Sequence, residues 1–95
     1  MKTVRIGIIG AGANTRNRHI PELLAIPDVK IVVVCNRTRE SGERVAAQFE
    51  IPEVETDWRA VVEREDLDAI VVGTWPYLHA PITIAALEAG KHVLV

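Results

Sequence analysis

Short apolar runs alternate with longer mixed segments along the whole chain. The runs are rich in Val and Ile and are apolar on successive residues, which is typical of strands covered on both faces of a parallel sheet. They predict strands at 4–9, 30–35, 69–72 and 92–95, with a weaker strand near Val54 and Glu55. The segments between them predict helices at 17–25, 39–50, 58–64 and 80–89, with Asp57 and Gly90 as boundary signals.

This alternation predicts an α/β fold built as a doubly wound parallel sheet. Right-handed crossovers favour about five strands in the order 3-2-1-4-5, forming one domain over residues 1–95. A ligand is then expected at the loop after the first strand, where the strand order reverses. The last helix is expected to bury a wide apolar face, made of Ile82, Ile84, Ala85, Ala86, Leu87 and Ala89.

The loop after the first strand is rich in glycine. Gly10 allows a sharp turn out of the strand, and Gly12, which has no Cβ, lets the backbone approach a pyrophosphate so that main-chain N–H groups donate to it. The start of the following helix adds partial positive charge. The loop therefore predicts dinucleotide binding, and its candidate contacts continue through Ala13, Asn14, Thr15 and Arg16. Thr15 replaces the usual third small residue, and a tight turn that binds nothing is the alternative.

The end of the second strand bears on the choice of coenzyme. Enzymes that prefer NAD usually carry an acidic residue there, whereas this chain has Asn36, followed by Arg37 and Thr38. An amide does not repel a 2′-phosphate, and Arg37, with Arg39 and the Thr38 hydroxyl nearby, could bind one. NADP is therefore favoured over NAD. The alternative is that Arg37 and Arg39 are solvated surface cations.

The composition of the chain limits the classes of binding partner that we expect. The chain has 11 basic and 13 acidic residues, a formal net charge of -2, and one cysteine, Cys35. Neither nucleic acid nor a membrane is an expected partner, no disulfide or metal site is expected, and the cytoplasm is the expected location. The acidic run at 63–68 is interpreted as a solvated connection.

Several motifs resemble those of the glucose–fructose oxidoreductase, inositol dehydrogenase and rhizopine-catabolism (Gfo/Idh/MocA) enzymes. They are the glycine loop, His19-Ile20-Pro21, the strand ending at Asn36, the run from Gly73 to His79, and the run from Ala85 to Val95. The resemblance implies the Rossmann-type coenzyme domain of an oxidoreductase acting on sugars, polyols or related small molecules. It also implies a second contact surface over the coenzyme, made by Thr74, Trp75, Pro76 and His79.

The chain departs from the family pattern at three places. The stretch before His19 is one residue longer, which would add Arg16 as a cation, and Trp75-Pro76 replaces the usual Pro-Asn. Trp75 could instead be a core or interface residue. The family typically continues into Glu-Lys-Pro and a substrate domain beyond Val95, so we expect an N-terminal fragment of a longer two-domain enzyme.

No catalytic residue is assigned, because the family's catalytic lysine would follow Val95 and the histidines are expected to be structural or to orient the coenzyme. These histidines are His19, His79 and His92. Two other functions stay open: a non-catalytic NAD(P)-sensing module, and binding of S-adenosylmethionine. An exposed last strand would also allow a homo-oligomer.

Overall fold

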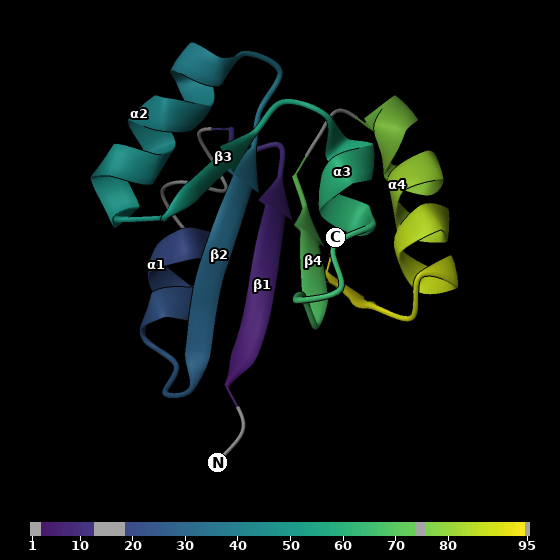
Figure 1. The fold of residues 1–95 in the computed structure, drawn as a ribbon, viewed down its shortest axis with the longest axis horizontal. Helices are drawn as coiled ribbons and strands as arrows, with labels where there is room; N and C mark the ends of the chain where they lie inside the picture. Colours follow the sequence, from purple (N-terminus) through teal and green to yellow (C-terminus); the bar gives the residue numbers. More distant parts are fainter. Residues whose placement is uncertain (1–2, 13–18, 74–75, 95) are drawn as a thin grey trace.

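Five parallel strands form one sheet in the order β3-β2-β1-β4-β5. The computed structural model describes residues 3–12, 19–73 and 76–94, with the backbone alone at 76–79. Helices flank the sheet on both sides (Figure 1). The predicted fold class and strand order are confirmed. The elements are β1 (Val4–Ile9), α1 (Ile20–Leu24), β2 (Val29–Cys35), α2 (Arg39–Phe49), β3 (Glu53–Glu55), α3 (Trp58–Val62), β4 (Ala69–Val72), α4 (Pro76–Glu88) and β5 (His92–Leu94).

The sheet separates two apolar cores. One side is packed by α1 and α2, through Ile20, Val45 and Ala46, against Ile6, Ile8 and other strand residues. The opposite side is packed by α3 and α4, through Val61, Val62, Ile82 and Ala86. Because both faces are covered, the central strands are apolar on successive residues, as the sequence pattern predicts.

Helix α3 and the loop after it pack directly against Gly7 of the central strand. An added Cβ at Gly7 of β1 would come within 2.8 Å of Leu67 Cδ1 and 2.9 Å of Val61 Cγ1. Glycine at this position therefore lets the helix and its following loop pack directly on the strand.

The predicted helix ends need correction. Helix α2 ends at Phe49, because Glu50 takes the left-handed conformation (φ 56°) that closes the helix. Helix α3 ends at Val62, two residues before the predicted end. Helix α4 begins at Pro76 instead of residue 80, because proline is tolerated where the first-turn N–H has no partner within the helix. Helix α1 is described from Ile20, and the predicted start at residue 17 lies outside the described residues.

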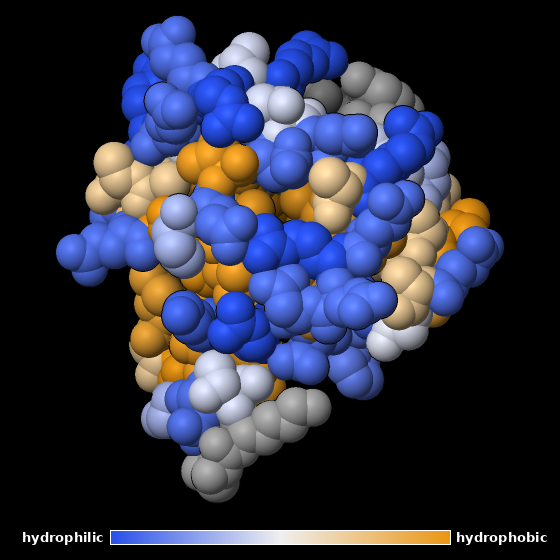
Figure 2. All heavy atoms as spheres, in the orientation of Figure 1, coloured by the Kyte–Doolittle hydropathy of each residue, from blue (hydrophilic) through white to orange (hydrophobic). Residues whose placement is uncertain are grey.

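The predicted buried face of α4 was also too wide. Ile82 and Ala86, four residues apart, are buried, whereas Ile84 is 55 % and Leu87 58 % exposed. The helix is apolar over more than the side that packs against the sheet. The face drawn in Figure 2 is mostly polar, with apolar side chains gathered toward the left, where β2 and α1 lie, and a smaller group at the right edge near α4.

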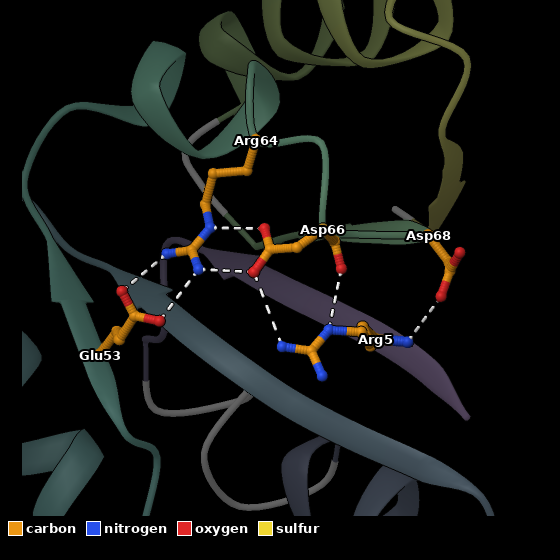
Figure 3. Close-up of polar contacts among 5 residues, drawn as sticks. All are labelled: Arg5, Glu53, Arg64, Asp66 and Asp68. Carbon is orange, nitrogen blue, oxygen red and sulfur yellow. Dashed lines mark hydrogen bonds and ion pairs between the residues drawn. The ribbon is translucent and has the colours of Figure 1, made fainter.

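The acidic run is not simply a solvated connection. Asp66 accepts hydrogen bonds from Arg64, and its carbonyl oxygen accepts one from Arg5 Nε (3.0 Å). Arg64 also binds both carboxylate oxygens of Glu53 (Figure 3). Asp68 Oδ2 accepts from the Arg5 backbone N–H (2.9 Å). These contacts tie β3 and β1 to the loop before β4, and we call Arg64, Glu53 and Asp66 the Arg64 clasp.

Two further observations concern the described residues only. Among them, no three His, Cys, Asp or Glu side chains are grouped so that they could hold a metal ion. In the same part of the chain, no helix has the length and apolar character needed to cross a membrane.

Candidate functional site

The candidate site lies where β1, β2 and β4 end side by side. Ile9 is paired with Cys35 of β2 and with Val72 of β4. Just beyond the strands, the Gly10 N–H donates to the Cys35 carbonyl oxygen (2.7 Å), and the Gly73 N–H donates to the Ile9 carbonyl oxygen (2.8 Å). The loops after these three strands therefore start together at the point where the sheet order reverses, as the sequence predicts.

The glycine turn has the backbone that its residues predict. Gly10 has a φ of 83°, a conformation that strains any residue with a Cβ. Ala11 is buried, and Gly12 is exposed, with no heavy atom of the described residues beyond its chain neighbours within 4 Å of the place where a Cβ would stand. A side chain at residue 12 would fill this open space, so the turn leaves room for a ligand against its backbone.

The N–H groups of Gly10, Ala11 and Gly12 are all hydrogen-bonded within the protein. The Gly10 N–H donates to Cys35, the Ala11 N–H donates to the Asn36 Oδ1 atom (2.7 Å), and the Gly12 N–H donates to the Gly10 carbonyl oxygen (3.0 Å). Which N–H groups donate to a phosphate stays a prediction. The next candidates, Ala13, Asn14, Thr15 and Arg16, lie outside the described residues.

Asn36 is half-buried and lies between the glycine turn and β3. Besides accepting from Ala11, it donates its backbone N–H to the Glu55 carbonyl oxygen (3.3 Å). Sequence analysis placed Asn36 at the coenzyme but missed its contact with the turn. The available signal was a short amide directly after β2, beside the strand that leads into the turn.

Arg37 and Arg39 are exposed, and neither has an ion-pair partner among the residues that the structure describes. Both guanidinium groups are thus available to an anion. The Thr38 hydroxyl has another role, because it caps α2: its Oγ1 accepts from the Ser41 N–H (3.2 Å) and donates to Ser41 Oγ (3.0 Å). Its contact with a phosphate stays a prediction.

Cys35 is buried at the end of β2. Desolvation, with smaller contributions from Glu55 and Asp57, raises the pKa of its thiol to about 12. The thiol is therefore protonated near neutral pH, which argues against a nucleophilic role and agrees with the interpretation of Cys35 as a small strand residue.

The second predicted contact surface is described only in part. Thr74 and Trp75 lie outside the described residues, whereas the backbones of Pro76 and His79 lie in the first turns of α4, directly after β4. Of the other histidines, His19 is exposed at the start of α1 and His92 is exposed in β5. Strand β4 separates β5 from β1, so His92 does not lie on a strand next to the glycine turn.

Comparison with known proteins identifies the relationship. Residues 4–95 match the model of an oxidoreductase family with an NAD-binding Rossmann fold, designated GFO/IDH/MocA. The chain belongs to this family. Among its Gfo/Idh/MocA relatives, a dTDP-3,4-didehydro-2,6-dideoxy-α-D-glucose 3-reductase from Saccharopolyspora spinosa is 38 % identical over 98 % of the chain. An inositol 2-dehydrogenase/D-chiro-inositol 3-dehydrogenase from Halalkalibacterium halodurans is 34 % identical, also over 98 %.

Solved structures of the Gfo/Idh/MocA family have the same fold. A K102A mutant of KijD10, a 3-ketoreductase from Actinomadura kijaniata in complex with TDP-benzene and NADP, superposes with a TM-score of 0.88 at 34 % identity over 97 % of the chain. A myo-inositol 2-dehydrogenase from Lactobacillus plantarum gives a TM-score of 0.87 at 29 % identity, also over 97 % of the chain. The chain spans 28 % and 27 % of the two sequence relatives, and 29 % and 27 % of the two structures.

Proposed function

We propose that this chain is the coenzyme domain of an NAD(P)-dependent oxidoreductase that acts on a sugar, a polyol or a related small molecule. The observation that carries the proposal is the glycine turn: Gly10 bends the chain at the switch point of the sheet, and Gly12 leaves open space against the backbone. A dinucleotide pyrophosphate needs such an approach to the main chain. Family membership and relatives that are sugar reductases and inositol dehydrogenases support the substrate class.

The preferred coenzyme in this proposal is NADP. Arg37 and Arg39 follow β2 and have no ion-pair partner among the described residues, so a 2′-phosphate would gain charge-assisted hydrogen bonds there. Asn36 adds no negative charge. The related ketoreductase structure with bound NADP supports the same choice, and NAD is the alternative coenzyme.

The bound nicotinamide would supply or accept the hydride, and the residues of this chain would bind and orient it. In this proposal Ala13 to Arg16 face the pyrophosphate, and Thr74, Trp75, Pro76 and His79 face the coenzyme from the loop after β4. The substrate would be held by a second domain of a longer protein, a proposal supported by two relatives that are more than three times as long as this chain. The buried single cysteine is consistent with work in the reducing cytoplasm.

Coenzyme titration tests the proposal. The chain is titrated with NADPH, NADH and S-adenosylmethionine by calorimetry, and the same titrations are repeated on Gly12→Ala and Gly12→Val. Gly12 is not in the left-handed region, and an added Cβ meets no atom of the described part of the chain within 4 Å, so both variants should stay folded. We expect the dinucleotides alone to bind the parent chain, with affinity weakened by Ala and abolished by Val as the open space is filled.

Unchanged dinucleotide affinity in folded Gly12→Val would remove the turn from the site. Binding of S-adenosylmethionine with no binding of either dinucleotide would contradict the proposed function. Circular dichroism and melting curves of the three proteins serve as the folding control.

A further inference from the structure

The hydrogen bond between Asn36 and the glycine turn continues the pattern of bonds that pairs β1 with β2. Two successive N–H groups after β1, those of Gly10 and Ala11, donate to two successive residues of the neighbouring segment, Cys35 and Asn36, each at 2.7 Å. The first acceptor is a backbone carbonyl and the second is the side-chain carbonyl of Asn36. The amide oxygen thus continues the pairing of β1 with β2 past the point where the backbones diverge.

This bond matters because Ala11 is buried. A buried N–H without an acceptor loses the free energy of its solvation by water, and among the described residues the only acceptor of the Ala11 N–H is Asn36 Oδ1. The acceptor is itself held, since the Asn36 backbone N–H donates to Glu55 of β3. The turn is therefore connected through one side chain to two neighbouring strands.

We propose that Asn36 is a positioning residue of the coenzyme site: its amide oxygen fixes the glycine turn, and this fixed orientation leaves its amide nitrogen as the atom available to a ligand. Within the described part of the chain, that nitrogen has no hydrogen-bond partner, and the side chain is half-buried. A nitrogen donor beside Arg37 suits a phosphate oxygen. An aspartate would hold the turn equally well but would present a charged oxygen instead. This second part rests on the proposed function, whereas the first does not.

Two variants of similar size separate these parts. Asn36→Asp keeps an acceptor for the Ala11 N–H and replaces the amide nitrogen, a donor, with a charged oxygen that accepts. Asn36→Leu removes both polar atoms. Hydrogen exchange of the Ala11 amide, followed by NMR on the coenzyme-free chain, measures whether the Ala11 N–H is still hydrogen-bonded in the glycine turn. Calorimetric titrations with NADPH and NADH measure the affinity of each protein for the two coenzymes.

In the parent chain and in Asn36→Asp, we expect the Ala11 amide to be protected from exchange. In Asn36→Leu it should exchange about tenfold faster, and both coenzymes should bind about tenfold more weakly, as expected for the loss of one buried hydrogen bond. Asn36→Asp should lose at least about tenfold in NADPH affinity through repulsion of the 2′-phosphate, while its NADH affinity stays within about threefold.

Equal Ala11 exchange in all three proteins would overturn the positioning role. Equal weakening of NADPH and NADH by Asn36→Asp, with Ala11 still protected, would overturn the assignment of the amide nitrogen to the ligand. If Asn36→Leu does not fold, the aspartate variant alone decides, because it must combine a protected Ala11 with selective loss of NADPH. If the parent chain binds no dinucleotide, the proposed function fails, and the exchange rates still decide whether Asn36 holds the turn.

Discussion

Replacing Arg64 by methionine should destabilise the fold and change its response to acid. Arg64 is 25 % exposed and forms two paired contacts: Nε and Nη2 with Asp66 (2.9 and 2.7 Å), and Nη1 and Nη2 with Glu53 (3.0 and 2.9 Å) (Figure 3). Methionine keeps much of the side-chain packing and removes the cation. The two carboxylates would then face each other across the vacated position.

The size of the expected loss in unfolding free energy follows from the solvent exposure of the two carboxylates. Glu53 and Asp66 are 52 % and 40 % exposed, so solvent screens both pairs and each is worth about 0.5–1 kcal/mol. Two pairs give about 1–2 kcal/mol of unfolding free energy at pH 7. Urea denaturation measures this difference, and Arg64→Lys should fall in between because it keeps the charge without the planar fork.

The pH dependence gives an independent readout. Hydrogen bonds from Arg64 lower the pKa of Asp66 to about 2 and hold the pKa of Glu53 below its usual range. Because both folded-state values are lowered, their contribution is present above the ordinary carboxyl pKa near 4 and is lost as the pH falls toward 2. Arg64→Met should therefore lose less stability than the parent chain between pH 5 and pH 2.

A matched control is Arg44→Met, since Arg44 contacts Glu40 only at 3.9 Å, with both side chains largely exposed. It should change stability by less than about 0.5 kcal/mol. Equal unfolding free energies of Arg64→Met and the parent chain at pH 7, or parallel acid profiles, would refute the role of the clasp.

Three other outcomes are expected. Arg37→Ala should weaken NADPH by about 1–3 kcal/mol and NADH much less, and equal weakening in parallel titrations would deny a 2′-phosphate contact. Gly10→Ala should lower the unfolding free energy by roughly 1–2 kcal/mol because φ is 83°, and an unchanged urea midpoint would contradict that strain. Cys35 should react with iodoacetamide at pH 8 about a thousandfold more slowly in the folded chain than in urea, since its pKa is raised to about 12; similar rates would show an accessible thiolate.

The strands were predictable because buried strands appear in the sequence as short contiguous runs of apolar residues. The bounds of β1 and β4 agree with the pattern to the residue, since both strands are central and covered on both faces. Helix ends were less predictable, because they depend on single residues whose conformation the pattern does not reveal. Glu50 ends α2 with a positive φ although it is not glycine, and Pro76 begins α4 four residues before the predicted start at residue 80.

The place of the glycine turn in the sheet was predictable, but its internal contacts were not. The turn at Gly10 and Gly12 follows from local sequence, whereas the bond from Ala11 to Asn36 joins residues 25 positions apart and exists only once β1 and β2 pair. The Arg64 clasp is similar, since Glu53 lies 11 residues from Arg64 and no periodic pattern connects them. The predicted roles of Ala13 to Arg16 and of Thr74 and Trp75 remain predictions.

The internal hydrogen bonds of the glycine turn suggest two separate roles within the loop: fixing the path of the chain and binding the pyrophosphate. Gly10, Ala11 and Gly12 donate their N–H groups to Cys35, Asn36 and Gly10, so these residues fix the path of the chain and leave space beside it. We therefore expect further hydrogen bonds to a pyrophosphate from the residues that follow. The resemblance to the family predicts that this segment is one residue longer than the usual pattern and that it adds Arg16 as a cation. We therefore expect coenzyme affinity to depend most on the length of this segment and on its added cation. The fixed turn before it is expected to set the position of the coenzyme.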